Sequence, residues 1–175
     1  AAQWARNNGV YEFQIGNEEE YHIDETTMTE AQIIANLKSV ATEVQSIFTN
    51  GKISYSCGQL LISDWVNTGK GDIDILAANV YQKHSSGYYN WQSDINNLVN
   101  AFGSNGAYIT EFNLSGISLD SYSADEVVQA EALSEMIEYI EGSGITRAFY
   151  FTWQNNAHGV IKSDGTYRQL WDQAF

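Results

Sequence analysis

The sequence contains no proline, a single cysteine and few basic residues, and these absences limit what the protein can be. One thiol, that of Cys57, excludes an internal disulfide and a metal site built from several thiolates. Lys and Arg number 8 against 22 Asp and Glu, which gives a formal net charge of −14. This balance argues against a nucleic acid or an anionic membrane as partner, because phosphate groups are bound by Lys and Arg.

Long hydrophobic runs are also missing. No stretch of about 18 apolar residues is present, so no membrane-spanning helix is expected. The first residues lack the basic and then apolar pattern of a secretory signal, and the sequence leaves the cellular compartment open. The histidines are scattered, without the helical pairing typical of zinc ligands, and we expect neither a metal site nor a cofactor.

What is present is a chain of 175 residues with 43% hydrophobic residues, which excludes a disordered segment and predicts one domain over residues 1–175. Short β-rich runs alternate along it with amphipathic stretches. The predicted strands are residues 10–15, 52–56, 73–81, 106–112 and 147–153. The predicted helices are residues 29–48, 60–66, 90–102, 123–140 and 167–174. The first helix is expected to begin with a capping box between Thr29 and Gln32.

This alternation of strands and helices indicates βαβ units, which give a parallel sheet with helices outside it. Two α/β architectures fit: an open doubly wound sheet, or part of a (β/α)8 TIM barrel. A doubly wound sheet should carry a glycine-rich loop after an early strand, and here the Gly-Ser-Asn-Gly run of residues 103–106 precedes a strand instead. A barrel should carry polar residues at the C-terminal ends of its strands. The sequence favours the barrel, because its strand ends carry Asn17 with Glu18, Asn79 with Tyr81, Glu111 and Trp153.

Two glutamates stand where predicted strands end, Glu18 after the first and Glu111 in the fourth. In a parallel sheet these ends share one face, so the two carboxyl groups are expected to converge. Cleavage of a glycosidic bond needs such a pair, one carboxyl to protonate the leaving oxygen and one carboxylate to attack or to activate water. A glutamate at a strand end can instead cap a helix. Glu12, Glu19 and Glu20 are interpreted as solvated charges.

Four segments resemble the clan A glycoside hydrolases. Residues 11–18, Tyr-Glu-Phe-Gln-Ile-Gly-Asn-Glu, resemble the fourth barrel strand of that superfamily, which carries an Asn-Glu pair. Residues 107–112 are similar to the seventh strand, which ends in the nucleophile, and residues 79–81 to the sixth. Residues 148–153 are similar to the eighth strand, whose Trp forms the floor of the sugar site. The order and spacing of the four segments match over nearly the whole chain.

The resemblance implies a hydrolase of β-glycosidic bonds in a poly- or oligosaccharide, acting by a retaining double displacement. Glu18 would be the general acid/base and Glu111 the nucleophile, with their carboxyl groups about 5–5.5 Å apart. A negative charge close to Glu18 is expected to raise its pKa, so that it keeps its proton until it is needed.

The resemblance also implies the substrate-binding residues. Asn17 would hydrogen-bond the sugar 2-hydroxyl, and Trp153 would stack under the ring. Tyr81 would hold Glu111 and stabilise its charge. Asn79 and His84 are further candidates, although His84 could equally face solvent from its predicted loop.

Strands one to three of the barrel have no counterpart here, so the sequence predicts a partial TIM barrel of about five parallel strands with outer helices. Such a sheet has open edges at residues 10–15 and 147–153, whose free amides and apolar surface invite association. We therefore expect a homodimer or another form of self-association. The expected partners are a carbohydrate and a second copy of the chain.

The missing strands also bear on activity, because in full relatives they carry further sugar-binding groups, commonly an Arg near the nucleophile. Arg147 stands at the start of its strand, the wrong end to replace that group. Substrate positioning is worth several kcal/mol of barrier, so weak or lost turnover is expected. The alternative is a non-catalytic protein, either a self-assembling partial barrel or a sugar-binding protein.

Overall fold

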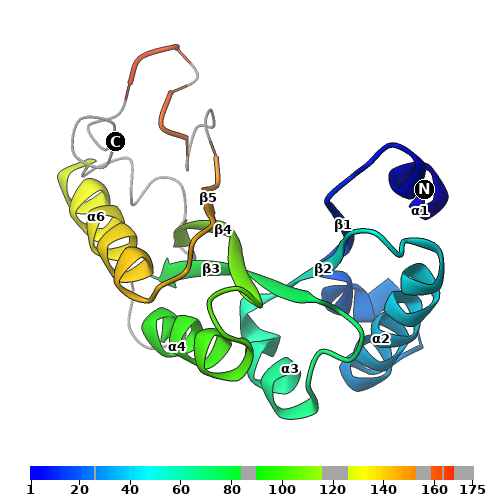
Figure 1. Cartoon of the computed structure of the whole chain (residues 1–175). Helices are drawn as coiled ribbons and strands as arrows, with labels where there is room; N and C mark the ends of the chain where they lie inside the picture. The colour runs from blue at the N-terminus through cyan, green and yellow to red at the C-terminus, as the bar shows by residue number, and fades with distance from the viewer. Residues whose placement is uncertain (26, 84–89, 116–125, 153–158, 163, 168–175) are drawn as a thin grey trace.

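A five-stranded parallel sheet forms the centre of the protein (Figure 1). The computed structural model describes residues 1–25, 27–83, 90–115, 126–152, 159–162 and 164–167. The strands are β1 (Glu12–Asn17), β2 (Lys52–Cys57), β3 (Ile75–Lys83), β4 (Ala107–Ser115) and β5 (Ala148–Tyr150), and they are neighbours in chain order. Because every neighbouring pair is parallel, the prediction of a partial barrel is confirmed.

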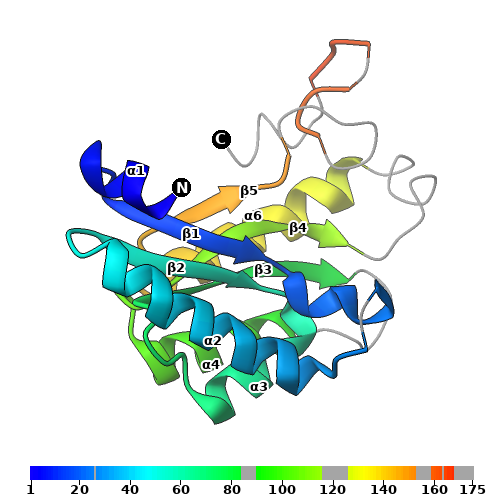
Figure 2. The ribbon, with the colours of Figure 1, turned by 90° about the vertical axis from the view of Figure 1, so that its right-hand side faces the viewer.

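Helices follow the strands and cover the convex side of the curved sheet (Figure 2). They are α2 (Glu30–Ile47), α3 (Ile62–Thr68), α4 (Trp91–Phe102) and α6 (Glu126–Gly142), and a short α1 (Ala2–Asn7) precedes β1. Two 3-10 segments, η1 (Glu19–Glu25) and η2 (Gln59–Leu61), follow β1 and β2. The predicted capping box of α2 is present: the Gln32 amide donates to the Thr29 hydroxyl, and the Thr29 amide donates to the Gln32 side chain.

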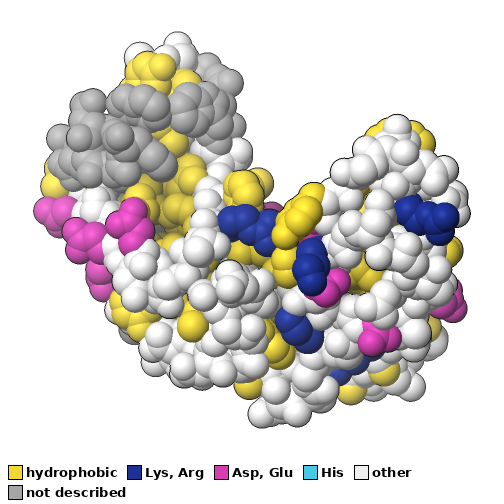
Figure 3. Space-filling model, in the orientation of Figure 1, with side chains coloured by type: hydrophobic (Ala, Val, Ile, Leu, Met, Phe, Trp, Pro, Cys, Tyr) yellow, Lys and Arg dark blue, Asp and Glu magenta, His cyan; other side chains and the backbone are white. Residues whose placement is uncertain are grey.

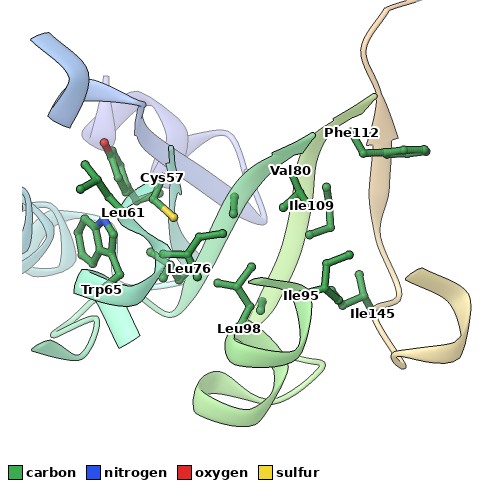
Figure 4. Packing of buried hydrophobic residues seen from close by; sticks show 14 of the residues in the cluster. Cys57, Leu61, Trp65, Leu76, Val80, Ile95, Leu98, Ile109, Phe112 and Ile145 are labelled. Carbon is green, nitrogen blue, oxygen red and sulfur yellow. The ribbon is translucent and has the colours of Figure 1, made fainter. Parts of the chain in front are cut away.

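The hydrophobic core lies between the sheet and the helices (Figure 4). Side chains that point outward from β2, β3 and β4 pack there against α3 and α4, and each of the following is at most 5% exposed: Cys57, Leu76, Val80, Ile109, Phe112, Trp65, Ile95 and Leu98. Most of the buried apolar side chains of the strands lie in this layer, and Ile75, Ala77 and Tyr108 form a separate small cluster. The C-terminal strand ends on the opposite, concave face carry polar groups. That face carries the site described below.

An ion pair joins the two edge strands across the concave face. Arg147, directly before β5, donates from Nη1 to Glu12 Oε2 on β1 over 2.6 Å. The same guanidinium lies 4.1 Å from the centre of the Tyr108 ring on β4, and the Tyr108 hydroxyl donates to Gln14 over 3.4 Å. The interpretation of Glu12 as a solvated charge is therefore wrong, because the curvature of the sheet brings it onto Arg147. These contacts tie together the N-terminal ends of the strands.

Replacing Glu12 with glutamine is expected to lower the free energy of unfolding by about 1 kcal/mol near neutral pH. Burial by itself would raise the pKa of Glu12, but the hydrogen bond and charge of Arg147 lower it below its ordinary value. The stabilisation is then present above the pKa of the unfolded chain and is lost as the pH falls through the folded value. Urea unfolding between pH 3 and 7 should show the difference between wild type and Glu12→Gln shrink toward acid, and a pH-independent difference would contradict this account. Glu43→Gln, on the exposed face of α2, is the matched control.

The half-barrel has an open edge on each side, since β1 pairs only with β2 and β5 only with β4 in the part of the chain that is described. Figure 3 shows the notch between the two edges, with hydrophobic and basic side chains on its floor. A mainly apolar groove of about 340 Å³ runs beside β1 and α2, lined in part by Ile15, Met28 and Leu37. Among the described residues, no helix has the length and hydrophobicity needed to cross a bilayer.

Candidate active site

A bulge in β4 turns Glu111 onto the concave face. Two consecutive residues of β3 pair with Ile109 and Glu111, which leaves Thr110 as an extra residue in β4. In a regular strand Glu111 would share the face of Ile109, which lies in the core. With the bulge, Phe112 returns to the core instead. Bulges commonly re-aim side chains in this way beside active sites.

Glu18 directly follows β1 and has a φ of +55°, in the left-handed region that is uncommon for residues other than glycine. Its amide donates to the Ser56 carbonyl on β2 over 2.8 Å, which fixes this turn to the neighbouring strand. Space is tight at Gly16, where a Cβ would lie 2.9 Å from Cγ of Glu19 and 3.1 Å from the ring of Tyr55. The local backbone thus sets the direction in which Glu18 leaves the strand end.

Glu111 is held by a tyrosine on the neighbouring strand. The Tyr81 hydroxyl on β3 donates a hydrogen bond to the Glu111 carboxylate. Burial, together with the hydrogen bond to Glu111 and its charge, raises the pKa of Tyr81, so the phenol keeps its proton and remains a donor. The backbone amide of Tyr81 donates over 2.8 Å to the side-chain oxygen of Gln59. The side-chain nitrogen of Gln59 in turn donates over 2.9 Å to the Asp94 carboxylate. A charge-assisted hydrogen bond from a fixed donor stabilises the Glu111 anion.

A line of polar side chains runs between the two glutamates. Asn79 on β3 donates to the Asn17 side chain over 3.4 Å and accepts from the Ser56 hydroxyl over 3.2 Å. The Ser56 hydroxyl also bonds that of Thr110. Asn79 and Ser56 are buried, whereas Asn17 is exposed and free to meet a ligand. The network fixes the Asn79 amide, which also hydrogen-bonds Glu18.

The two carboxyl groups lie in different electrostatic environments. Burial raises the pKa of Glu18, and the negative charges of Glu111 and Glu20 add to the rise, while the hydrogen bond from Asn79 partly offsets it. Glu18 therefore keeps its proton to a higher pH than an exposed glutamate does. Glu111 instead faces the hydroxyl donor of Tyr81. One carboxyl with a raised pKa and one that accepts a hydrogen bond from a phenol can divide acid and nucleophile roles between them.

The structure thus brings together most of the residues that the sequence predicts for this site: Glu18, Glu111, Asn17, Asn79 and Tyr81. His84 and Trp153 lie outside the described residues. Within the described ranges, no group of three or more His, Cys, Asp or Glu side chains is arranged to hold a metal ion.

Glu20 is the residue of this region that sequence reasoning missed. It is fully buried, so its interpretation as a solvated charge is wrong, whereas Glu19 beside it is exposed as expected. Its carboxylate accepts hydrogen bonds from the Tyr55 hydroxyl, the Gly58 amide over 3.2 Å and the Trp65 indole over 3.1 Å. A run of three glutamates carries no signal that separates one from the next, because the turn of η1 decides which of them is buried.

The chain matches one known protein family and shares its fold with several solved structures. The family described as glycosyl hydrolase catalytic core matches residues 25–172. Among curated proteins, none matches this sequence. Of the solved structures, β-glucuronidase 2 from Bacteroides uniformis, covalently bound to cyclophellitol-6-carboxylate aziridine, superposes with a TM-score of 0.65 at 12% identity. The match covers 90% of this chain and 22% of that one.

Two further structures share the fold. An exo-β-1,4-mannosidase from Opitutaceae bacterium strain TAV5 has a TM-score of 0.65 at 12% identity, over 91% of this chain and 34% of that one. A family 10 xylanase from Thermobacillus composti has a TM-score of 0.51 at 11% identity, over 80% and 57%. The chain thus spans between 22% and 57% of the lengths of these three structures. At these identities the similarity establishes the fold.

Proposed function

The chain belongs to the glycosyl hydrolase catalytic core family, as its resemblance to the clan A glycoside hydrolases implied. From this premise we propose that it acts as a retaining glycosidase with weak turnover. In this proposal Glu18 is the general acid/base and Glu111 the nucleophile. Asn17 hydrogen-bonds the sugar 2-hydroxyl, and Trp153 forms the floor of the sugar site.

One observation carries the proposal: the contrast between the surroundings of the two carboxyl groups. Burial and nearby negative charge raise the pKa of Glu18, which favours a proton donor there. The Tyr81 hydroxyl bonds Glu111, which favours an anion able to attack carbon. A capping role for either glutamate would not require the other, nor the buried polar line between them.

The proposed reaction has two steps. In the first step, Glu111 attacks the anomeric carbon while the bond between that carbon and the leaving oxygen breaks. Glu18 donates its proton to the leaving oxygen. This forms a covalent glycosyl-enzyme with Glu18 as an anion. In the second step Glu18 takes a proton from water, the water oxygen attacks the same carbon, and Glu111 is released. Two displacements at one carbon retain its configuration.

The proposed substrate is a poly- or oligosaccharide with β-glycosidic bonds. The three structural neighbours are named for a glucuronide, a mannoside and a xylan, and the first two names specify a β linkage. These names support the β linkage and leave several sugar units as test substrates.

Proton NMR of the first-formed product tests the stereochemistry. We expect aryl β-glucuronides, β-mannosides or β-xylosides to release the β anomer first, with the α anomer appearing later by mutarotation. The reason is that two inversions at the anomeric carbon restore its starting configuration. An α anomer as the first product would reject the double displacement.

We also propose that the protein self-associates through its open edges, most simply as a homodimer. Among the described residues β1 pairs only with β2, and an apolar groove lies beside it. Both features support self-association, because free strand edges and apolar surface favour contact between chains. Light scattering at several concentrations should give a mass above that of one chain, 19.6 kDa. Replacing Ile15 with lysine, at the groove, should shift the mass toward one chain, and a wild-type mass of one chain throughout would contradict the proposal.

A further inference from the structure

We propose that Glu20 is a positioning residue for Glu18, an inference that rests on the glycosidase function proposed above. Glu20 stands two residues after Glu18, yet its side chain is fully buried among residues of the helix-side core. It therefore does not lie on the concave face that carries the proposed active site. Any effect of Glu20 on the reaction must therefore pass through other residues, and Glu18, two positions before it, is the nearest of them in the chain.

Hydrogen bonds from three elements fix the Glu20 carboxylate. The Tyr55 hydroxyl on β2, the Gly58 amide and the Trp65 indole on α3 all donate to it. The Tyr55 hydroxyl also accepts from the Glu19 amide over 2.9 Å, so one side chain of β2 holds both residues that follow Glu18. With residues 19 and 20 fixed, the left-handed turn at Glu18 has little freedom to relax.

The segment that holds Glu20 also supports the other half of the site. The Leu60 amide donates to the Tyr21 hydroxyl over 3.1 Å, which adds a second tie between η1 and the segment Gly58–Leu60. Between these contacts, Gln59 accepts from the Tyr81 amide over 2.8 Å. A change at Glu20 can therefore affect Glu18 along the chain. It can also affect Tyr81 through Gly58 and Gln59.

Glu20 also contributes charge behind Glu18. In the described part of the chain, each hydrogen bond to its oxygens comes from a neighbouring donor. Among the described residues, the titratable groups that interact with Glu18 are Glu111 on β4, Tyr81 on β3, Cys57 on β2 and Glu20 on η1. Of these, Glu111 and Glu20 carry the negative charges that favour the protonated form of Glu18.

The test compares Glu20→Gln with Glu19→Gln, which removes the same charge from the exposed neighbour. Carbon-13 NMR of labelled glutamate carboxyl groups follows the titration of Glu18, with Glu18→Gln used for assignment. In Glu20→Gln the Glu18 titration should move to lower pH, because a buried like charge has been removed. In Glu19→Gln it should stay at the wild-type position. An unchanged Glu18 titration in folded Glu20→Gln would overturn the inference.

This readout does not depend on turnover, so it separates the inference from the proposed function. If wild type hydrolyses no glycoside, the function fails while the titration still decides the role of Glu20. If it does hydrolyse one, kcat/KM of Glu20→Gln should fall by up to about 100-fold, because the acid/base would be misplaced. The alkaline limb of its pH profile should also move to lower pH, which a merely structural change would not cause.

Tyr55→Phe keeps the test decisive if circular dichroism shows that Glu20→Gln is unfolded. It leaves the Glu20 charge in place and removes both hydrogen bonds of the Tyr55 hydroxyl. The amide resonances of Glu18 and Glu19 should then shift from their wild-type positions. Unchanged amide resonances in folded Tyr55→Phe would show that this contact does not position Glu18.

Discussion

Replacing Glu111 with glutamine is expected to lower kcat on aryl β-glycosides by about 10⁴-fold or more. The amide cannot attack the anomeric carbon, so no covalent intermediate forms. The glutamine can still accept from the Tyr81 hydroxyl, and the local structure should be preserved. Initial rates with an activated aryl leaving group measure the loss.

Glu43→Gln is the matched control, since it removes one carboxylate from the exposed face of α2 and should leave kcat unchanged. Equal thermal midpoints of wild type and Glu111→Gln would show that the loss is chemical. Retention of more than a tenth of wild-type kcat by folded Glu111→Gln would exclude Glu111 as nucleophile.

Replacing Glu18 with glutamine should have the second largest effect, and its size should depend on the leaving group. For a natural sugar leaving group, kcat/KM should fall about 10²- to 10⁴-fold, because that oxygen needs a proton as it departs. For an activated aryl group the fall in kcat/KM should be much smaller. Comparing the two substrate types in one variant isolates the acid role.

The pH profile provides an independent check on Glu18. Because its pKa is raised, wild type should keep the proton donor to higher pH and lose kcat/KM as the pH rises through that pKa. In Glu18→Gln this alkaline limb should disappear. With Glu18→Ala, added azide should restore turnover of the activated substrate as a β-glycosyl azide, since an anion needs no general base. An alkaline limb that persists in Glu18→Gln would assign it to another group.

The sequence predicted the architecture and the partners at the strand ends for a simple reason. Apolar strands that alternate with amphipathic helices leave few topologies, and a parallel sheet puts all C-terminal strand ends at one face. That rule was enough to predict that the ends of β1, β3 and β4 meet. The contact of Tyr81 with Glu111 was implied by the resemblance to the clan A glycoside hydrolases, and the hydrogen bond between Asn79 and Asn17 was not predicted.

These rules do not predict the local backbone conformation at the site. Regular alternation would have left Glu111 on the face of Ile109, and only the extra residue Thr110 turns it inward. The left-handed φ of Glu18 likewise depends on contacts to β2 that are formed on folding. A bulge inserts one extra residue and so shifts the pairing register of the strand by one. A single sequence does not indicate where that residue is inserted.

The misjudged charges have a similar cause. Glu12 meets Arg147 across 135 positions of chain, a contact that only the curvature of the half-barrel creates. Glu20 is buried, and its carboxylate accepts hydrogen bonds from donors on β2, in the turn after β2 and on α3. Charged residues are normally solvated, and that rule fails where the fold supplies partners that composition does not reveal.

The most direct test of the central claim is covalent trapping of the nucleophile. Activated 2-deoxy-2-fluoro-β-glycosides of several sugars would be incubated with the protein, and the peptides sequenced by mass spectrometry. We predict one added fluorosugar, on Glu111, and none in Glu111→Gln. Sugar binding without any covalent adduct would support the non-catalytic alternative, and an adduct on another residue would contradict the assignment of Glu111.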